Sequence, residues 1–232
     1  MLLAIDTATN FAGLALWGDG QLWAEEAWYS HLTHSVELMP RVQRMLTAQR
    51  LTVEQLTGIG VSLGPGSFTG LRTGLAAAKG MALPYRLPVV GIATLDAVAF
   101  PFQRAGAAVW AVLQAGRGRI GVACYAWVEE VWTQVVGPTL TTFEDLCRLA
   151  TPPAMFVGEI DGRQAELLQG TLGPGAIIPS AALRFRRAGC LAELAAARLD
   201  SNDVDDAATL APIYLQTPEG QPAPSGESVP PR

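Results

Sequence analysis

The chain has 232 residues, of which 50% are hydrophobic and 16% are charged, and its formal net charge is −5. This composition provides a packed core and excludes a natively disordered protein, which combines few apolar residues with high charge. The acidic balance gives no overall support for direct nucleic-acid binding, which relies on clustered Lys and Arg side chains.

The first part of the chain predicts a small antiparallel sheet and then alternating helices and strands. Residues 2–5 are an apolar run that ends at Asp6, and Gly18-Asp19-Gly20 predicts a hairpin turn between two further strands, 14–17 and 21–28. Apolar spacing then predicts three helices, separated by two buried strands. These helices are expected at 35–49, 69–83 and 95–102, and the strands at 59–63 and 89–92.

The same order of elements repeats after residues 103–106. Three strands are followed by helices that alternate with strands, so the repetition predicts two lobes, residues 1–103 and 104–217. The expected strands are 108–114, 120–127, 131–136, 154–158 and 176–178, and the expected helices are 142–150, 162–169 and 189–199. From Pro218 the chain is rich in Pro, Gly and Ser, so residues 218–232 are predicted to form a disordered tail.

A glycine-rich loop, Gly64-Pro65-Gly66, joins a predicted strand to a predicted helix. Such a loop directs backbone N–H groups and the positive end of the helix dipole at one point, where phosphates bind in many proteins. It is neither a Walker A loop, because Leu71 and Arg72 follow Gly70, nor a nucleophile elbow around Ser67. The helix after it has small residues at three- and four-residue spacing, which allows close approach of a sheet or another helix.

Three segments of the first half resemble the TsaB (YeaZ) family in order and spacing. They are Ala4-Ile-Asp-Thr-Ala-Thr9, His34-Ser-Val-Glu-Leu-Met-Pro40 and the run from Gly64 to Gly80, and residues 89–97 continue the match. The resemblance covers nearly all of residues 1–98. The second half matches loosely, through Gly116-Arg-Gly-Arg119 and Pro212-Ile-Tyr-Leu215.

The resemblance implies an α/β protein with the actin/Hsp70-like (ASKHA) fold, in which each of two lobes is a mixed β-sheet flanked by helices. It implies a non-catalytic scaffold that binds and supports the catalytic paralogue TsaD in tRNA N6-threonylcarbamoyladenosine formation, alongside the ATPase TsaE. Contact with tRNA is then expected only indirectly, and the chain alone is expected to be a homodimer. Two alternatives stay open: an M22-type glycoprotease-like hydrolase and a small nucleotide-binding enzyme of the same fold.

The resemblance also shows which residues are missing. In the catalytic paralogue two histidines on one helical turn hold the metal, and the corresponding positions here are Thr94 and Val98, which are poor ligands for iron or zinc. The two histidines of the chain, His31 and His34, are interpreted as exposed residues at a helix start. We therefore expect no metal site and no catalytic residue, so the chain is predicted to be an accessory subunit and not an enzyme.

A nucleotide site in this fold needs one acidic loop in each lobe. Asp6 could serve in the first loop, beside Gly64 and Gly66, but Gln114 stands where the second loop more often has Asp, and an amide is a weaker Mg²⁺ ligand. These glycines and Asp6 are expected to form at most a vestigial nucleotide-binding site. No cofactor is expected, and ATP or ADP binding is expected only in the complex.

The partner interface is predicted on the two long helices of the first lobe, 35–49 and 69–83. The alternative is that the same side chains are buried against the lobe's own sheet. The candidate residues are Leu38, Met39, Val42, Leu46, Leu71, Gly74, Leu75 and Ala78.

Cysteines, arginines and the N-terminus complete the expectations. The three cysteines are widely spaced and indicate neither a disulfide framework nor a zinc site. The densest basic cluster, Arg184, Arg186 and Arg187, is interpreted as the solvated start of a helix.

The N-terminal apolar run is too short for a signal peptide and no run reaches the ~18 residues of a membrane span, so a cytoplasmic protein is predicted.

Overall fold

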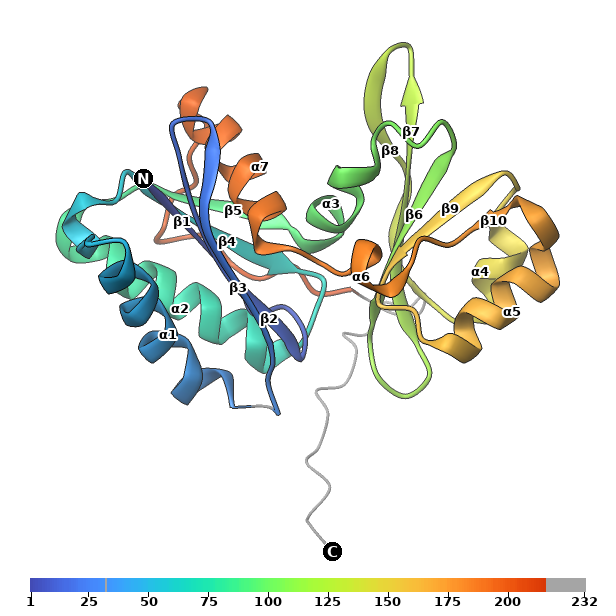
Figure 1. The fold of residues 1–232 in the computed structure, drawn as a ribbon, viewed down its shortest axis with the longest axis horizontal. Helices are drawn as coiled ribbons and strands as arrows, with labels where there is room; N and C mark the ends of the chain where they lie inside the picture. Colours follow the sequence, from blue (N-terminus) through green and yellow to red (C-terminus); the bar gives the residue numbers. More distant parts are fainter. Residues whose placement is uncertain (32, 216–232) are drawn as a thin grey trace, which may run out of the picture.

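A computed structural model describes residues 1–31 and 33–215 as two lobes, each built on a five-stranded sheet (Figure 1). The first sheet has the order β3-β2-β1-β4-β5, in which β1 runs antiparallel to β2 and parallel to β4. Its strands are β1 (Leu2–Asp6), β2 (Phe11–Gly18), β3 (Gln21–Tyr29), β4 (Gly58–Gly64) and β5 (Val89–Ala93). The predicted mixed sheet of the first lobe is thereby confirmed.

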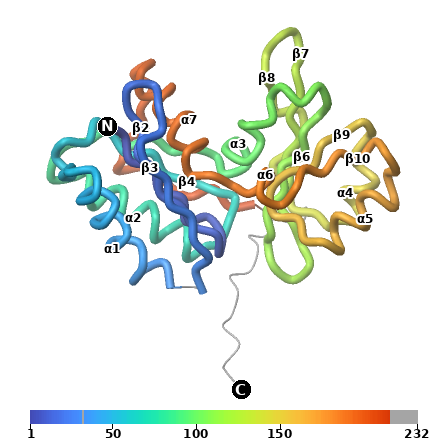
Figure 2. The backbone as a smooth tube through the Cα atoms, viewed as in Figure 1, coloured from blue at the N-terminus to red at the C-terminus, as the bar shows by residue number. Residues whose placement is uncertain are grey.

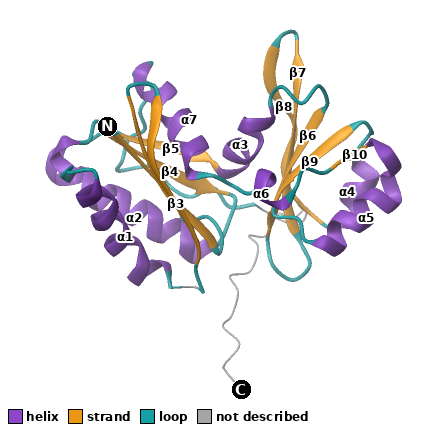
Figure 3. Ribbon diagram, viewed as in Figure 1, coloured by secondary structure: helices purple, strands orange, loops and turns teal. Residues whose placement is uncertain are grey.

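Helices cover both faces of the first sheet (Figure 3). Successive residues of a strand point to opposite faces, so Leu3 and Ile5 of β1 pack under α1 (His34–Ala48) and α2 (Phe68–Tyr85), whereas Leu2 and Ala4 pack under α7 (Ala188–Asp200). The sheet is therefore buried on both sides.

The second lobe repeats this plan with the order β10-β9-β6-β7-β8 (Figure 2). Trp110 and Val112 face the core under α4 and α5, and Val109 and Ala111 face α3, which lies between the two sheets. The elements are α3 (Thr94–Ala99), β6 (Ala108–Gln114), β7 (Ile120–Val128), β8 (Val131–Thr141), α4 (Phe143–Leu149), β9 (Ala154–Gly158), α5 (Gly162–Leu172), β10 (Ala176–Ile177) and α6 (Ala181–Arg184), with short 3-10 turns at Val53–Gln55, Phe100–Phe102 and Gly173–Gly175.

The boundary predicted for the second lobe needs a correction, because the chain returns to the first lobe after α6. Helix α7 packs on the first sheet, where a Cβ at Gly60 would lie only 2.7 Å from Ala195 Cβ. After the helix, the Asp205 carboxylate accepts a hydrogen bond from Gly91 N at 2.7 Å, and Ile213 N donates to Leu63 O at 2.7 Å. Residues 188–215 therefore pack mainly on the first lobe, where α7 buries the second apolar face of the sheet. The predicted tail, 218–232, lies outside the described residues.

Over residues 1–31 and 33–215, no helix combines the length and the apolar character needed to cross a bilayer.

Candidate functional site

A buried ion-pair cluster joins the two lobes at the base of the crevice between them. Its cation is Arg186, just before α7, whose side chain is 2% exposed. The guanidinium donates from Nε to the carboxylate of Asp6 at the end of β1, and from Nη1 to Glu159, just after β9, at 3.3 Å. Nη2 donates to Thr9 Oγ1 at 3.2 Å and to the carbonyl oxygen of Phe11. Arg186 therefore crosslinks a loop of each lobe.

The remaining acceptors of this cluster are also satisfied. Ala8 N donates to Asp6 Oδ1 at 3.0 Å, and Gln114 N donates to Glu159 Oε2 at 2.9 Å. Burial lowers the pKa of the Arg186 guanidinium, but the two carboxylates outweigh burial and raise that pKa above its ordinary value. The expectation that Arg186 lies in a solvated helix start was wrong, because β1 and the loop after β9 enclose it. The positive charge that pairs with the Asp6 carboxylate is therefore an arginine of the same chain.

The crevice above this cluster has a volume of about 380 Å³. Gln114 Nε2 donates to Glu159 O at 2.8 Å and to Gln164 Oε1 at 3.1 Å. The side-chain amide expected in place of an Asp in the second loop is therefore hydrogen-bonded to groups of its own chain. The arginine at its rim, Arg184, donates to Pro179 O and to Ile160 O at 2.7 and 2.6 Å. The polar groups of the crevice are mostly bonded to one another, and no activated nucleophile lies among them.

The loop Gly64-Pro65-Gly66 packs on the chain's own backbone. A Cβ at Gly66 would lie 2.2 Å from Ala8 O, and a Cβ at Gly64 would lie 2.3 Å from Ile213 O. Ser67 N donates to Ala8 O at 2.6 Å, and Ser67 Oγ accepts from Gly70 N as the cap of α2. Close chain packing therefore accounts for these glycines. The vestigial nucleotide role of Asp6, Gly64 and Gly66 stays a prediction.

Thr94 and Val98, the residues expected from the resemblance at the positions of the paralogue's histidines, have structural roles. Thr94 Oγ1 accepts a hydrogen bond from Gly64 N at 3.1 Å, and Val98 lies in the core between α3 and the second sheet. In the described part of the chain, no group of three His, Cys, Asp or Glu side chains is arranged to hold a metal ion.

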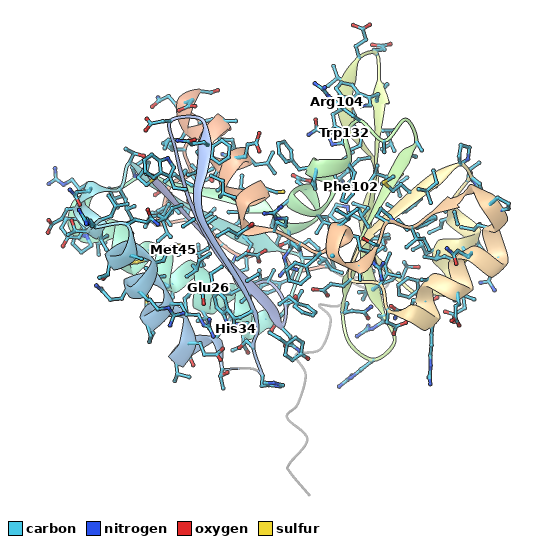
Figure 4. All side chains as sticks on the ribbon, in the orientation of Figure 1. Glu26, His34, Met45, Phe102, Arg104 and Trp132 are labelled. Atoms are coloured by element: carbon cyan, nitrogen blue, oxygen red, sulfur yellow. The ribbon has the colours of Figure 1, made fainter. Side chains whose placement is uncertain are left out.

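The two histidines differ in their surroundings. His31 is exposed, with its ring 5.0 Å from that of Tyr29, but His34 is only 3% exposed, so the expectation of an exposed side chain was wrong for His34 (Figure 4). Neither ring nitrogen of His34 has a hydrogen-bond partner among the described residues. Burial lowers the pKa of His34, and the charges of Glu37 and Asp6 offset part of this shift. His34 thus begins α1 close to the ion-pair cluster.

The candidate interface residues are mostly buried within their own lobe. Met39 is exposed, but the others form the contact of α1 and α2 with the sheet, which is the alternative left open from the sequence. At Gly74 a Cβ would lie 2.3 Å from Thr7 Oγ1, so the helix touches β1 closely. The buried candidates are Leu38, Val42, Leu46, Leu71, Gly74, Leu75 and Ala78. The interface stays a prediction, and residues on the opposite face of each helix must carry it.

The outward faces of these two helices, which lie next to each other (Figure 2), expose apolar and small residues together with polar ones such as Gln43 and Arg44. Val36 of α1 is 68% exposed and Leu83 of α2 is 81% exposed. Ala76 and Gly80 share the exposed side of α2 with Leu83, at four- and three-residue spacing, and leave little side-chain bulk. A helix of another chain could pack there at close range.

Comparisons with known proteins agree with this architecture. The family described as TsaD, tRNA N6-adenosine threonylcarbamoyltransferase, matches residues 29–205. The tRNA threonylcarbamoyladenosine biosynthesis protein TsaB of Bacillus subtilis is 27% identical over 95% of this chain and 96% of that protein. The Escherichia coli protein of the same name is 39% identical over 42% of each chain. Among solved structures, YeaZ from Pseudomonas aeruginosa superimposes with a TM-score of 0.73 at 22% identity, covering 92% of this chain and 99% of that one. The expected actin/Hsp70-like fold is confirmed.

Proposed function

Because the chain belongs to the TsaB (YeaZ) family and has a role in tRNA threonylcarbamoyladenosine biosynthesis, we propose that it is the non-catalytic subunit that binds and supports a TsaD-type catalytic subunit. The observation that carries this proposal is the exposed apolar face of α1 and α2. On the same basis the chain pairs with a second copy of itself when TsaD is absent, and a TsaE-type ATPase acts with the complex.

The composition of this face supports a protein partner. Val36, Met39 and Leu83 provide exposed apolar side chains, which mark interaction sites when they gather on one surface. Ala76 and Gly80 allow the backbones of two helices to come close. The one lysine of α2, Lys79, is engaged within the chain, since its Nζ donates to Leu210 O at 2.8 Å. The exposed charged side chains of these helices include Arg44 of α1, which is 62% exposed, so a partner would need an acceptor for it.

The interlobe cluster supports the non-catalytic role. Asp6 is paired with Arg186, so a divalent cation would have to displace a buried guanidinium. Thr94 and Val98 are part of the packing and supply no metal ligand. These features disfavour both alternatives, the glycoprotease-like hydrolase and the independent nucleotide-binding enzyme.

Size-exclusion chromatography with light scattering tests the proposal. The chain is mixed with a TsaD-type subunit, with and without ATP, and a heterodimer is expected. The variant A76E/L83E places two charges on the face and should raise the Kd of the complex by about 30-fold or more, the effect of losing an interface hot spot. Leu183→Glu is the matched control, because Leu183 on α6 is 67% exposed but lies in the other lobe.

Two results would oppose the proposal. Failure of the wild-type chain to form a heterodimer under every nucleotide condition would refute the scaffold role. A heterodimer that tolerates A76E/L83E as well as L183E would refute the assigned face and leave the scaffold role intact.

A further inference from the structure

An exposed stack of aromatic and guanidinium groups lies at the start of α2. The rings of Phe68 and Tyr214 stack with centroids 5.2 Å apart and planes 29° apart, and Arg72 Cζ lies 3.7 Å from the Phe68 ring centroid. Arg72 Nε also donates to Tyr214 Oη at 3.1 Å, which orders the stack. The two aromatic residues remain 40% and 36% exposed. The stack is therefore an ordered, solvent-facing platform with π faces and a positive charge.

The stack adjoins an arginine-bearing turn of the second lobe. The end of the described chain crosses from the first lobe toward the second (Figure 1), and a Cβ at Gly121 would lie 2.9 Å from Leu215 Cδ1 and 3.7 Å from Pro65 Cγ. Gly121 is two residues beyond the turn between β6 and β7. That turn closes through Arg119 N to Gly116 O at 3.0 Å and places Arg117 at its exposed tip, with φ of 55°. Tyr214 and Arg119 thus belong to one side of the molecule.

Beyond the turn lies a shallow hollow of about 480 Å³. Arg119 and Arg148 line it together with the hydroxyl-bearing Thr141 and Thr142, the carboxylate of Asp145, and Leu140 and Leu149. Arg148 also pairs with Asp145 at 2.6 Å, but both side chains are at least half exposed, so that pair is weak and can exchange partners. The hollow has the size and the donors to accept a phosphate group.

The charge of this side differs from that of the whole chain. Residues 64–72, 114–121 and 207–215 contain no Asp or Glu, although the chain has 21 such residues. Carboxylates do lie beside these segments. Glu159 accepts from Gln114 N and Asp206 accepts from Ala208 N, each at 2.9 Å, and Glu144 and Asp145 lie on α4. Among the described residues Arg72, Arg117 and Arg119 form no salt bridge, whereas Arg148 pairs with Asp145. A local positive surface therefore exists on a protein whose net charge is −5.

We propose that this surface, the aromatic stack together with the β6–β7 turn and the hollow beside it, contacts RNA. Guanidinium groups bind backbone phosphates, and exposed aromatic rings stack on unpaired bases. Leu149 and Ile213 beside this surface are also exposed, so binding of a protein partner is the other outcome that the test distinguishes. The inference goes beyond the scaffold role and rests on the chain's role in tRNA modification. Direct contact is the alternative to purely indirect tRNA contact, which stays a prediction.

Salt-dependent binding of an unmodified tRNA transcript tests the proposal, measured by fluorescence anisotropy for the full chain alone and for its complex with a TsaD-type subunit. Replacing both turn arginines in R117A/R119A should weaken binding by roughly five- to eight-fold per arginine at about 0.1 M salt, and reduce the slope of log K against log salt by about 1.4 to 1.8. The stack variant F68A/Y214A should weaken binding to single-stranded RNA more than to duplex RNA.

Two controls separate charge position from folding and from net charge. R117K/R119K keeps the charges and the left-handed backbone at residue 117, so the salt slope should be retained. R104A/R163A removes two charges from exposed positions elsewhere and should leave RNA affinity within about two-fold. Equal RNA affinity for R117A/R119A and wild type, alone and in the complex, would overturn the proposal. Loss of the heterodimer in R117A/R119A with unchanged RNA binding would also overturn it, because this surface would then be a protein interface. Failure of the scaffold role would instead appear as a wild-type chain that forms no heterodimer.

Discussion

Removing the guanidinium of Arg186 should destabilise the protein more than any other single arginine substitution. In Arg186→Ala the carboxylates of Asp6 and Glu159 stay near the base of the crevice without their cation. Breaking a buried ion pair by removing one partner costs about 3–5 kcal/mol, because the remaining charge is uncompensated. For a chain of this size each kcal/mol corresponds to about 2–4 °C in Tm, so a fall of about 6–20 °C is expected.

Thermal and urea unfolding followed by circular dichroism measures this effect. Arg186→Lys keeps one charge but lacks the forked donors, so its loss should lie between those of wild type and Arg186→Ala. In the background D6N/E159Q, which removes both negative charges, the same Arg186→Ala substitution should cost at least 1 kcal/mol less, because the charges no longer interact. A cost below about 1 kcal/mol for Arg186→Ala in the wild-type background would refute the assignment of this cluster as the crosslink between the lobes.

Three further predictions concern the histidine, the helix glycines and nucleotide. Burial lowers the pKa of His34, so the folded protein binds this proton less tightly than the unfolded chain, and its stability should fall as the pH drops through about 6.5. In His34→Gln the free energy of unfolding in urea should therefore depend less on pH between about pH 7.5 and 5.5. An unchanged pH dependence would contradict this. Gly70→Ala would bring a Cβ within 2.2 Å of Thr7 O and should lower the free energy of unfolding in denaturant by about 1–3 kcal/mol. Gly80→Ala, whose Cβ would have no atom within 4 Å, should raise it by up to about 1 kcal/mol. Equal effects of the two substitutions would contradict the close contact of α2 with Thr7. Mg-ATP at about 5 mM should shift the Tm of the isolated chain by less than about 1 °C, because Asp6 is already paired, and a shift of several degrees would show binding.

Local patterns predicted most of the individual elements. The turn at Gly18-Asp19-Gly20 joins β2 to β3 as expected, with positive φ at Asp19 and Gly20. The apolar spacing of α1 likewise predicted a helix, and the observed helix has the expected length with each end one residue earlier in the chain. These features depend on neighbours within a few residues, so they can be predicted from a single sequence.

Contacts between distant segments could not be predicted in the same way. Arg186 and Asp6 are 180 residues apart, and nothing in an arginine-rich helix start indicates that a carboxylate of β1 will enclose one of the three arginines. The position of α7 was missed for the same reason, since its periodicity predicts a helix but not the sheet on which it packs. For the interface candidates, apolar spacing selected mostly side chains that the lobe buries against its own sheet, because the side chains that a lobe buries and those that a partner buries have the same composition.

Reconstitution of tRNA threonylcarbamoyladenosine formation is the most direct test of the central claim. A TsaD-type subunit and the other pathway components are assayed for modified tRNA with no addition, with this chain, and with its A76E/L83E and L183E variants. The scaffold account predicts product with the wild-type chain and L183E, and little product without the chain or with A76E/L83E. Equal product formation in the absence of this chain, or with A76E/L83E, would contradict it.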